Sequence, residues 1–147
     1  MTSLVDILER IFPIGRLDKA SEGLIILTDD GRLHHRLSHP SFDHEKVYRV
    51  TVTRAVSNDA LKQLSSGVDL DGIRTRPAKV RRISEKQFRI TLQEGRNRQI
   101  RRMVGKVGHR VKRLKRVRVA NIRLDKLKPG HWRHLSEVEK TVLLKGL

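Results

Sequence analysis

The sequence contains no cysteine, few aromatic residues and no long apolar run, and each absence excludes a class of protein. Without cysteine the chain forms neither disulfides nor thiolate metal sites. No apolar stretch approaches the roughly 20 residues of a membrane span, and the residues after Met1 do not resemble a signal peptide. Aromatic residues make up 3% of the chain, too few for the stacking platforms that coat single-stranded nucleic acid. The sequence therefore predicts a soluble, cytoplasmic protein that does not bind membranes.

Acidic residues are scarce as well. The chain has 33 Lys and Arg against 16 Asp and Glu, a net charge of +17 and a pI near 11.3, so the expected partner is a polyanion, with nucleic acid first. Between Lys79 and Arg118, 16 cations stand against two acids. Because apolar residues are interleaved with these cations in a regular pattern, we expect a folded phosphate-binding face rather than a disordered basic tail.

Apolar periodicity predicts one α+β domain of 147 residues with a largely antiparallel sheet. The strand Lys46–Thr53 alternates, so Tyr48 points inward with Val50 and Val52, and Arg49 points outward. Helices are expected over 4–11, over 32–37, from a cap at Asn58 to Gly67, around Ile100–Val107, and after a capping box of Ser136 and Glu139. Strands are expected at Gly23–Thr28, Lys46–Thr53, Lys79–Arg82, Gln87–Leu92, 113–119 and 120–124.

Asp18 stands between two cations directly before the apolar stretch GLIILT. A loop ahead of a buried strand can hold a reactive side chain rigidly at the rim of a cleft. An isolated aspartate in this position is more often a turn residue or a helix cap. What favours a functional residue is the order of three longer stretches: GRLDKASEGLIILTDDG, then HEKVYRVTV, then EGRNRQIRRM with RLKRVRV after it.

These stretches resemble those of the pseudouridine synthases, in the branch of the small-subunit ribosomal enzyme and its large-subunit relatives. The likeness runs from about Phe12 to the C-terminus and is greatest to the enzymes of large-subunit (23S) ribosomal RNA. It implies the catalytic fold of that family and the isomerisation of uridine to pseudouridine in ribosomal RNA. Family members usually begin with an S4 RNA-binding module and a first catalytic strand with a Lys-Pro motif. Neither is found here, so we expect residues 1–147 to be the catalytic domain alone.

The resemblance also assigns catalytic roles. Asp18 would be the nucleophile, attacking the uridine at its sugar or its ring. Arg101 would pair with this carboxylate, since a neighbouring cation favours the ionised form, although a phosphate contact is the plain alternative for this arginine. Tyr48 would stack on the target uracil.

Four further residues would bind the substrate. Reaching a glycosidic bond in structured RNA requires flipping the base out of the stack. The resemblance implies that Leu114 packs against the flipped base and that Arg16 enters the stack in its place. Arg98 and Arg102 are expected to contact phosphate.

Neither a metal nor an organic cofactor is expected, because the implied isomerisation is redox-neutral. Four clustered histidines are not expected to form a metal site, because the chain has no cysteine and no i, i+4 histidine pair supported by carboxylates on a helix. They are interpreted as surface or RNA-facing residues: His34, His35, His39 and His44. Two other functions stay open, a non-catalytic RNA-binding or ribosome-assembly protein and a synthase acting on transfer RNA. The chain is expected to act as a monomer.

Overall fold

The computed structural model describes residues 12–14, 17–38 and 44–145. The helix expected over 4–11 lies outside these residues. The strands, in chain order, are β1 (Phe12–Ile14), β2 (Glu22–Gly23), β3 (Ile26–Thr28), β4 (Lys46–Val52), β5 (Asp69–Leu70), β6 (Ile73–Arg74), β7 (Lys79–Ser84), β8 (Gln87–Leu92), β9 (Val111–Val119) and β10 (Ile122–Arg123). The helices are α1 (Gly31–Ser38), α2 (Asn58–Ser66), α3 (Gln99–Lys106) and α4 (Glu137–Lys145).

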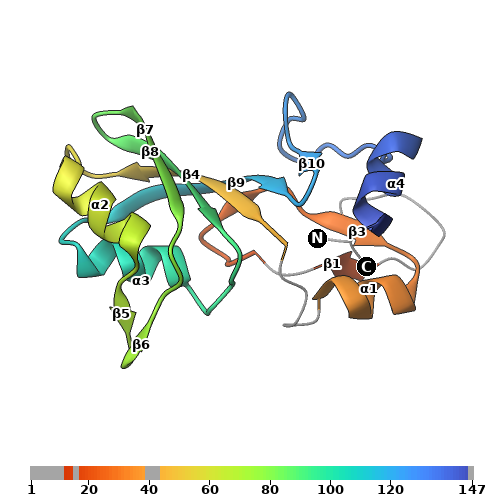
Figure 1. Ribbon diagram of the computed structural model, residues 1–147. Coiled ribbons are helices and arrows are strands. Elements are labelled where there is room, and N and C mark those ends of the chain that lie inside the picture. Colours follow the sequence, from red (N-terminus) through yellow and green to blue (C-terminus); the bar gives the residue numbers. More distant parts are fainter. Residues whose placement is uncertain (1–11, 15–16, 39–43, 146–147) are drawn as a thin grey trace.

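One mixed sheet connects the two halves of the molecule. Its strand order is β10-β9-β4-β8-β7, and β2 pairs with β9 off this path, at Lys115 and Arg116. Every pairing is antiparallel except that of β2 with β9, which is parallel. Figure 1 shows α2 and α3 at one end of this sheet and α1 and α4 at the other. The predicted α+β fold with a largely antiparallel sheet is confirmed.

The first core lies between one face of the sheet and helices α2 and α3. Val50 and Val52 of β4 are fully buried there, and Tyr48 packs beside them as the alternation predicted. Arg49 therefore lies on the opposite face of the sheet. The other buried members of the first core are Val56, Ala60, Leu64, Val68, Leu70, Ala78, Phe88, Ile90, Leu92, Ile100, Met103, Val104 and Leu114.

A second core lies beside α1 and α4, at the other end of β9. Strand β9 contributes Leu114 to the first core and Val119 to the second. Because β2 pairs with β9 at Lys115 and Arg116, the chain enters the sheet between the two cores. The buried members of the second core are Ile14, Leu24, Ile26, Leu37, Val119, Ile122 and Leu143.

The strand expected over Gly23–Thr28 is in fact two strands. Gly23 has a φ of 114°, and the chain leaves β9 there. Residues Ile26–Thr28 then pair with β1 instead, in a separate two-stranded sheet. A continuous apolar run could not reveal this change of partner, because strand pairing depends on residues elsewhere in the chain.

Two details around α2 also differ from the prediction. The helix is capped by Ser57 rather than Asn58, since the Ser57 hydroxyl accepts from the amide of Ala60 at 3.1 Å. The hairpin of β5 and β6 was not predicted. Its turn residues Asp71 and Gly72 have φ of 56° and 79°, and an Asp-Gly pair is a known signal for this kind of turn.

The predicted capping box opens α4. The hydroxyl of Ser136 accepts from the amide of Glu139 at 3.1 Å, and the amide of Ser136 donates to the Glu139 carboxylate at 2.9 Å. Arg133 donates to both carboxylate oxygens at 2.7 and 2.8 Å. The hydrogen bond from Arg133, aided by Ser136, lowers the pKa of Glu139 to about 2.

Replacing Glu139 by glutamine should cost about 1 kcal/mol of stability at neutral pH through loss of the charged bond to Arg133, because glutamine can still accept from the Ser136 amide. Because the folded pKa is lowered, the contribution of the ionised carboxylate is fully present above about pH 4.5 and is lost as the pH falls towards 2. The difference in melting temperature between the wild type and Glu139→Gln should therefore be constant from pH 5 to 8 and shrink below. A difference independent of pH down to about 3 would contradict this.

Candidate active site

Asp18 lies in the loop that leads into β2 and is half-buried. Its backbone carbonyl accepts from the amide of Ser21 at 2.9 Å, which closes a turn around it. Its carboxylate makes no hydrogen bond or ion pair with the described residues. The loop is thus folded, and none of the residues that the structure describes pairs with its acid.

Arg101 of α3 reaches the same loop. Its Nη2 donates to the carbonyl of Ala20 at 2.7 Å. Its Nε is buried and has no hydrogen-bond partner in the described part of the chain. The ion pair that the resemblance implied between Arg101 and Asp18 is not formed in this structure. The guanidinium instead holds the backbone two residues after the acid.

Strand β9 holds the other side of the loop. The amide of Leu24 donates to the carbonyl of Arg116 at 2.9 Å, and the Arg116 Nε donates to the carbonyl of Leu24 at 2.9 Å. Both oxygens of Glu22 accept from Arg113, and this bond lowers the pKa of Glu22. The Asp18 loop is therefore fixed from two directions, by a helix and by a strand.

Glycine is required at position 23. A Cβ there would overlap the carbonyl of Arg116 and lie 2.6 Å from its amide nitrogen. The φ of 114° is also one that other residues rarely adopt. Because Gly23 has no side chain, β2 can approach β9 closely enough to pair with it, and this pairing fixes the position of the loop.

Tyr48 lies on the strand next to β9. It faces Arg116 in the register of β4 and β9, and its ring is half-buried against the first core. The strand that anchors the Asp18 loop is thus also the direct neighbour of Tyr48. Leu114, by contrast, is 5% exposed and faces Val50, so its side chain belongs to the core and presents little surface to a base.

The predicted phosphate-binding residues differ in availability. Arg16 lies outside the described residues. Arg98 precedes α3 with φ 49° and ψ 35°, is exposed, and its side chain has no hydrogen bond among the described residues. Arg102 forms an ion pair with Asp71 and donates to the carbonyl of Asn97 at 3.1 Å. Arg98 is free to meet a phosphate, whereas Arg102 is held by protein contacts.

The cations between Lys79 and Arg118 do not form one face, which corrects the sequence-based expectation. Arg82 donates to the carbonyl of Val56 at 2.6 Å, and Arg96 donates to that of Leu70 at 2.6 Å. These arginines tie loops to the body of the domain. The sequence could not separate them from phosphate-binding residues, because their carbonyl partners lie 26 residues away.

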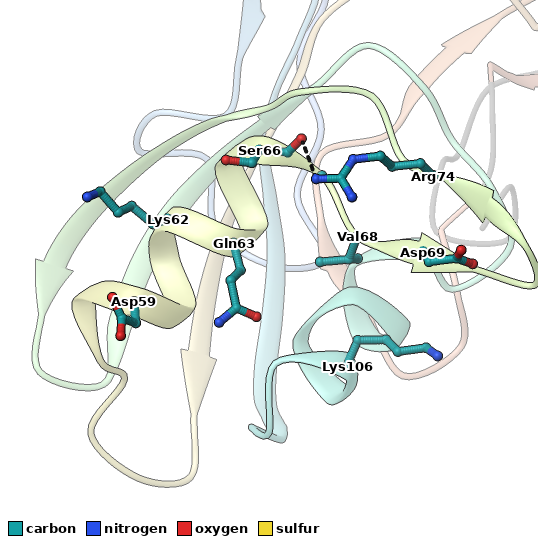
Figure 2. A pocket seen from close by; sticks show the side chains of 9 residues that line it. Asp59, Lys62, Gln63, Ser66, Val68, Asp69, Arg74 and Lys106 are labelled. Carbon is teal, nitrogen blue, oxygen red and sulfur yellow. Dashed lines mark hydrogen bonds between the residues drawn. The ribbon is translucent and has the colours of Figure 1, made fainter.

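An open hollow of about 720 Å³ lies between α2, β5, β6 and α3 (Figure 2). None of the predicted site residues lines it. Its lining combines acids and cations, with Arg74 donating to the carbonyl of Ser66 at 3.5 Å. A mixed lining of this kind does not have the one-sided charge expected of a site for RNA.

No group of three or more metal-ligating side chains gathers in the described part of the chain. Among the same residues, no helix has the length and apolar character needed to cross a membrane.

An acidic side chain that no described residue pairs with, held on an anchored loop of a basic α+β domain, is typical of an enzyme site that faces a polyanion. Residues 5–106 match the family model described as RNA pseudouridylate synthase, and the chain belongs to this family. A crystal structure of a pseudouridylate synthase superimposes with a TM-score of 0.85 at 34% identity, over 90% of this chain and 59% of that one. The family and fold that the sequence motifs indicated are confirmed.

Two curated relatives are similar over most of the chain. The dual-specificity RNA pseudouridine synthase RluF of Escherichia coli K12 is 44% identical over 137 residues, 93% of this chain and 47% of the relative. The ribosomal small subunit pseudouridine synthase A of Salmonella typhimurium LT2 is 41% identical over 133 residues, 88% of this chain and 58% of the relative. The chain spans about half the length of these relatives.

Sequence reasoning missed the residues that hold the loop. A glycine inside an apolar strand is a signal of close backbone approach, so Gly23 could have been found. The ion pair of Glu22 and Arg113 had no local signal, because the two residues are 91 positions apart.

Proposed function

We propose that this chain is an RNA pseudouridine synthase that acts on ribosomal RNA with Asp18 as its nucleophile. The observation that carries the proposal is the Asp18 carboxylate, which pairs with none of the described residues, on a loop fixed by Arg101 and by β9. Family membership supports the reaction, and the name of the small-subunit relative supports the class of substrate. The site is built from elements of one chain, so the proposal needs no second copy.

The proposed reaction leaves the composition of the RNA unchanged. The Asp18 carboxylate attacks the uridine, at its sugar or its ring, while the bond from N1 to the ribose carbon C1′ breaks. The uracil rotates, C5 forms a new bond to C1′, and the bond between the Asp18 oxygen and the uridine breaks, which restores the free carboxylate. C5 then loses its hydrogen as a proton and N1 gains one. This balance involves no oxidant, reductant or activated group.

Tyr48 and Arg101 position the reactants in this proposal. The half-buried ring of Tyr48 offers a surface for the target uracil next to the anchored loop. The buried Nε of Arg101 is a donor without a partner, which costs about 1 to 3 kcal/mol if nothing satisfies it. This donor would be satisfied by an acceptor group of the RNA, or by the Asp18 carboxylate once RNA is bound.

Release of tritium from ribosomal RNA labelled at C5 of uridine tests the function, because only this hydrogen is lost. We expect release with the wild-type chain and none from RNA labelled at C6, which is the matched control. Salt-sensitive binding without release would favour the non-catalytic RNA-binding protein instead. Release from labelled transfer RNA but not from ribosomal RNA would favour the alternative substrate.

Arg101→Lys separates the two roles open to this arginine. Lysine keeps the charge but has no planar guanidinium to hold Ala20 while presenting a second donor. A shift of the loop by about 1 Å should lower kcat by about 100-fold while KM stays within about threefold. Steady-state tritium release measures both constants, with Arg98→Lys as the control. A raised KM with unchanged kcat would show a phosphate contact instead.

A further inference from the structure

Four cations form one row across the face of the sheet opposite the first core. In the strand register, Lys115 of β9 faces Arg49 of β4, and Arg49 faces Arg89 of β8. Arg89 in turn faces Arg81 of β7. Arg81 and Arg89 are exposed, and Arg49 and Lys115 are half-buried. We call these four residues the outer basic row.

The row lies on the other side of the sheet from the helix that carries Arg101. Val50 and Leu114, each next to a member of the row along its strand, point into the first core against α3. Side chains of successive strand residues point to opposite faces. Glu22 confirms the grouping, since Lys115 and Arg49 both contribute to lowering its pKa, after its hydrogen bond to Arg113.

The row is unfavourable in the free protein. Like charges directly opposite each other on neighbouring strands are destabilising. None of the four side chains makes a hydrogen bond or ion pair with the described residues. Glu22 lies nearby, but its carboxylate is engaged by Arg113. Cations on an edge strand can prevent aggregation, which accounts for Arg81 on β7 but not for Arg49 and Arg89 in the sheet interior.

We propose that the outer basic row binds the phosphate backbone of an RNA segment other than the one that holds the target uridine. The proposal rests on the proposed function for the nature of the polyanion. Three strand spacings give the row a width of roughly 14 Å, and its long side chains can meet several phosphates. The row contains no aromatic residue, so it holds the backbone without reading bases. It extends the RNA-binding surface to both faces of the sheet.

The triple variant Arg49→Gln/Arg81→Gln/Arg89→Gln tests the row against ribosomal RNA. Each phosphate contact weakens by a factor of about 3.5 when salt rises from 50 to 200 mM, so the affinity loss of the variant over this range should be about 40-fold smaller than that of the wild type. KM for tritium release should rise and kcat should not change. The control is Arg123→Gln/Lys126→Gln/Lys128→Gln, which removes three exposed cations elsewhere.

The proposal for the outer basic row would be overturned by unchanged affinity and salt dependence in the triple variant, or by an equal change in the control. Weaker binding to polyglutamate or to anionic phosphatidylglycerol vesicles with unchanged RNA binding would assign the face to another partner and also overturn it. The proposed function fails separately, if the wild type binds RNA through the row but releases no tritium.

Discussion

Asp18→Asn should lower tritium release from C5-labelled ribosomal RNA on the order of 10⁴-fold or more, with RNA affinity within about twofold of wild type. The amide keeps the size of the side chain but removes the attacking anion. Because the carboxylate makes no hydrogen bond or ion pair with the described residues, the replacement should change stability by no more than about 0.5 kcal/mol. Single-turnover release, filter binding and thermal melting measure the three quantities.

Asp29→Asn is the matched control for this experiment. Asp29 is an exposed aspartate in the turn before α1, and its replacement should leave tritium release unchanged. Release by Asp18→Asn at the wild-type rate would refute the assigned nucleophile. If Asp18→Asn also lost RNA binding, the residue would hold substrate rather than attack it, and the proposal would be lost in the same way.

Gly23→Ala should destabilise the protein by about 3 kcal/mol or more and lower activity at least about 100-fold. The new Cβ overlaps the carbonyl of Arg116, and that oxygen accepts the bond from Leu24 that joins the loop to β9. Backbone strain and overpacking each cost about 1 to 3 kcal/mol. Denaturant unfolding gives the stability, and tritium release below the melting temperature gives the activity that remains once the loop has shifted.

Gly72→Ala is the control that separates the effect of backbone strain from that of steric overlap with β9. Gly72 also has a positive φ, 79°, but a Cβ there meets nothing within 4 Å. It should cost about 1 to 2 kcal/mol and leave activity intact. Equal effects of the two variants would show that backbone conformation alone, rather than close approach to β9, makes glycine necessary at position 23.

The local sequence pattern was sufficient to predict an element's orientation where its apolar face packs against a single core. The alternation in β4 placed Tyr48 and Arg49 on opposite faces, and the spacing of Ile100, Met103 and Val104 placed α3 against the sheet. The capping box of α4 was also visible, because its two partners are three residues apart. These features depend on neighbours in sequence, so periodicity and capping rules recover them.

The structure brings some of the predicted site residues near one another, and their roles stay predictions. The order of the motifs indicated the family and selected Asp18, Tyr48 and Arg101, and the structure brings the loop of Asp18 to α3 and to the strand beside Tyr48. It does not show the ion pair of Asp18 with Arg101, and it buries Leu114 in the core. Side-chain partners across 81 residues depend on the packing of a helix against a loop, which no local pattern encodes.

By itself the sequence determined the α+β class, the basic character and the family, since these depend on composition, short-range periodicity and motif order, and it selected Asp18 as the predicted nucleophile. Only the tertiary structure decided that the stretch predicted as one strand, Gly23–Thr28, is divided between two partners. Gly23 belongs to β2, which pairs in parallel with β9, and Ile26–Thr28 pairs with β1. The tertiary structure alone also divided the arginines into those that tie loops to the domain and those that form the outer basic row. The physical reason is that strand pairing and charge placement depend on residues far apart in the chain, whose contacts exist only once the sheet has formed.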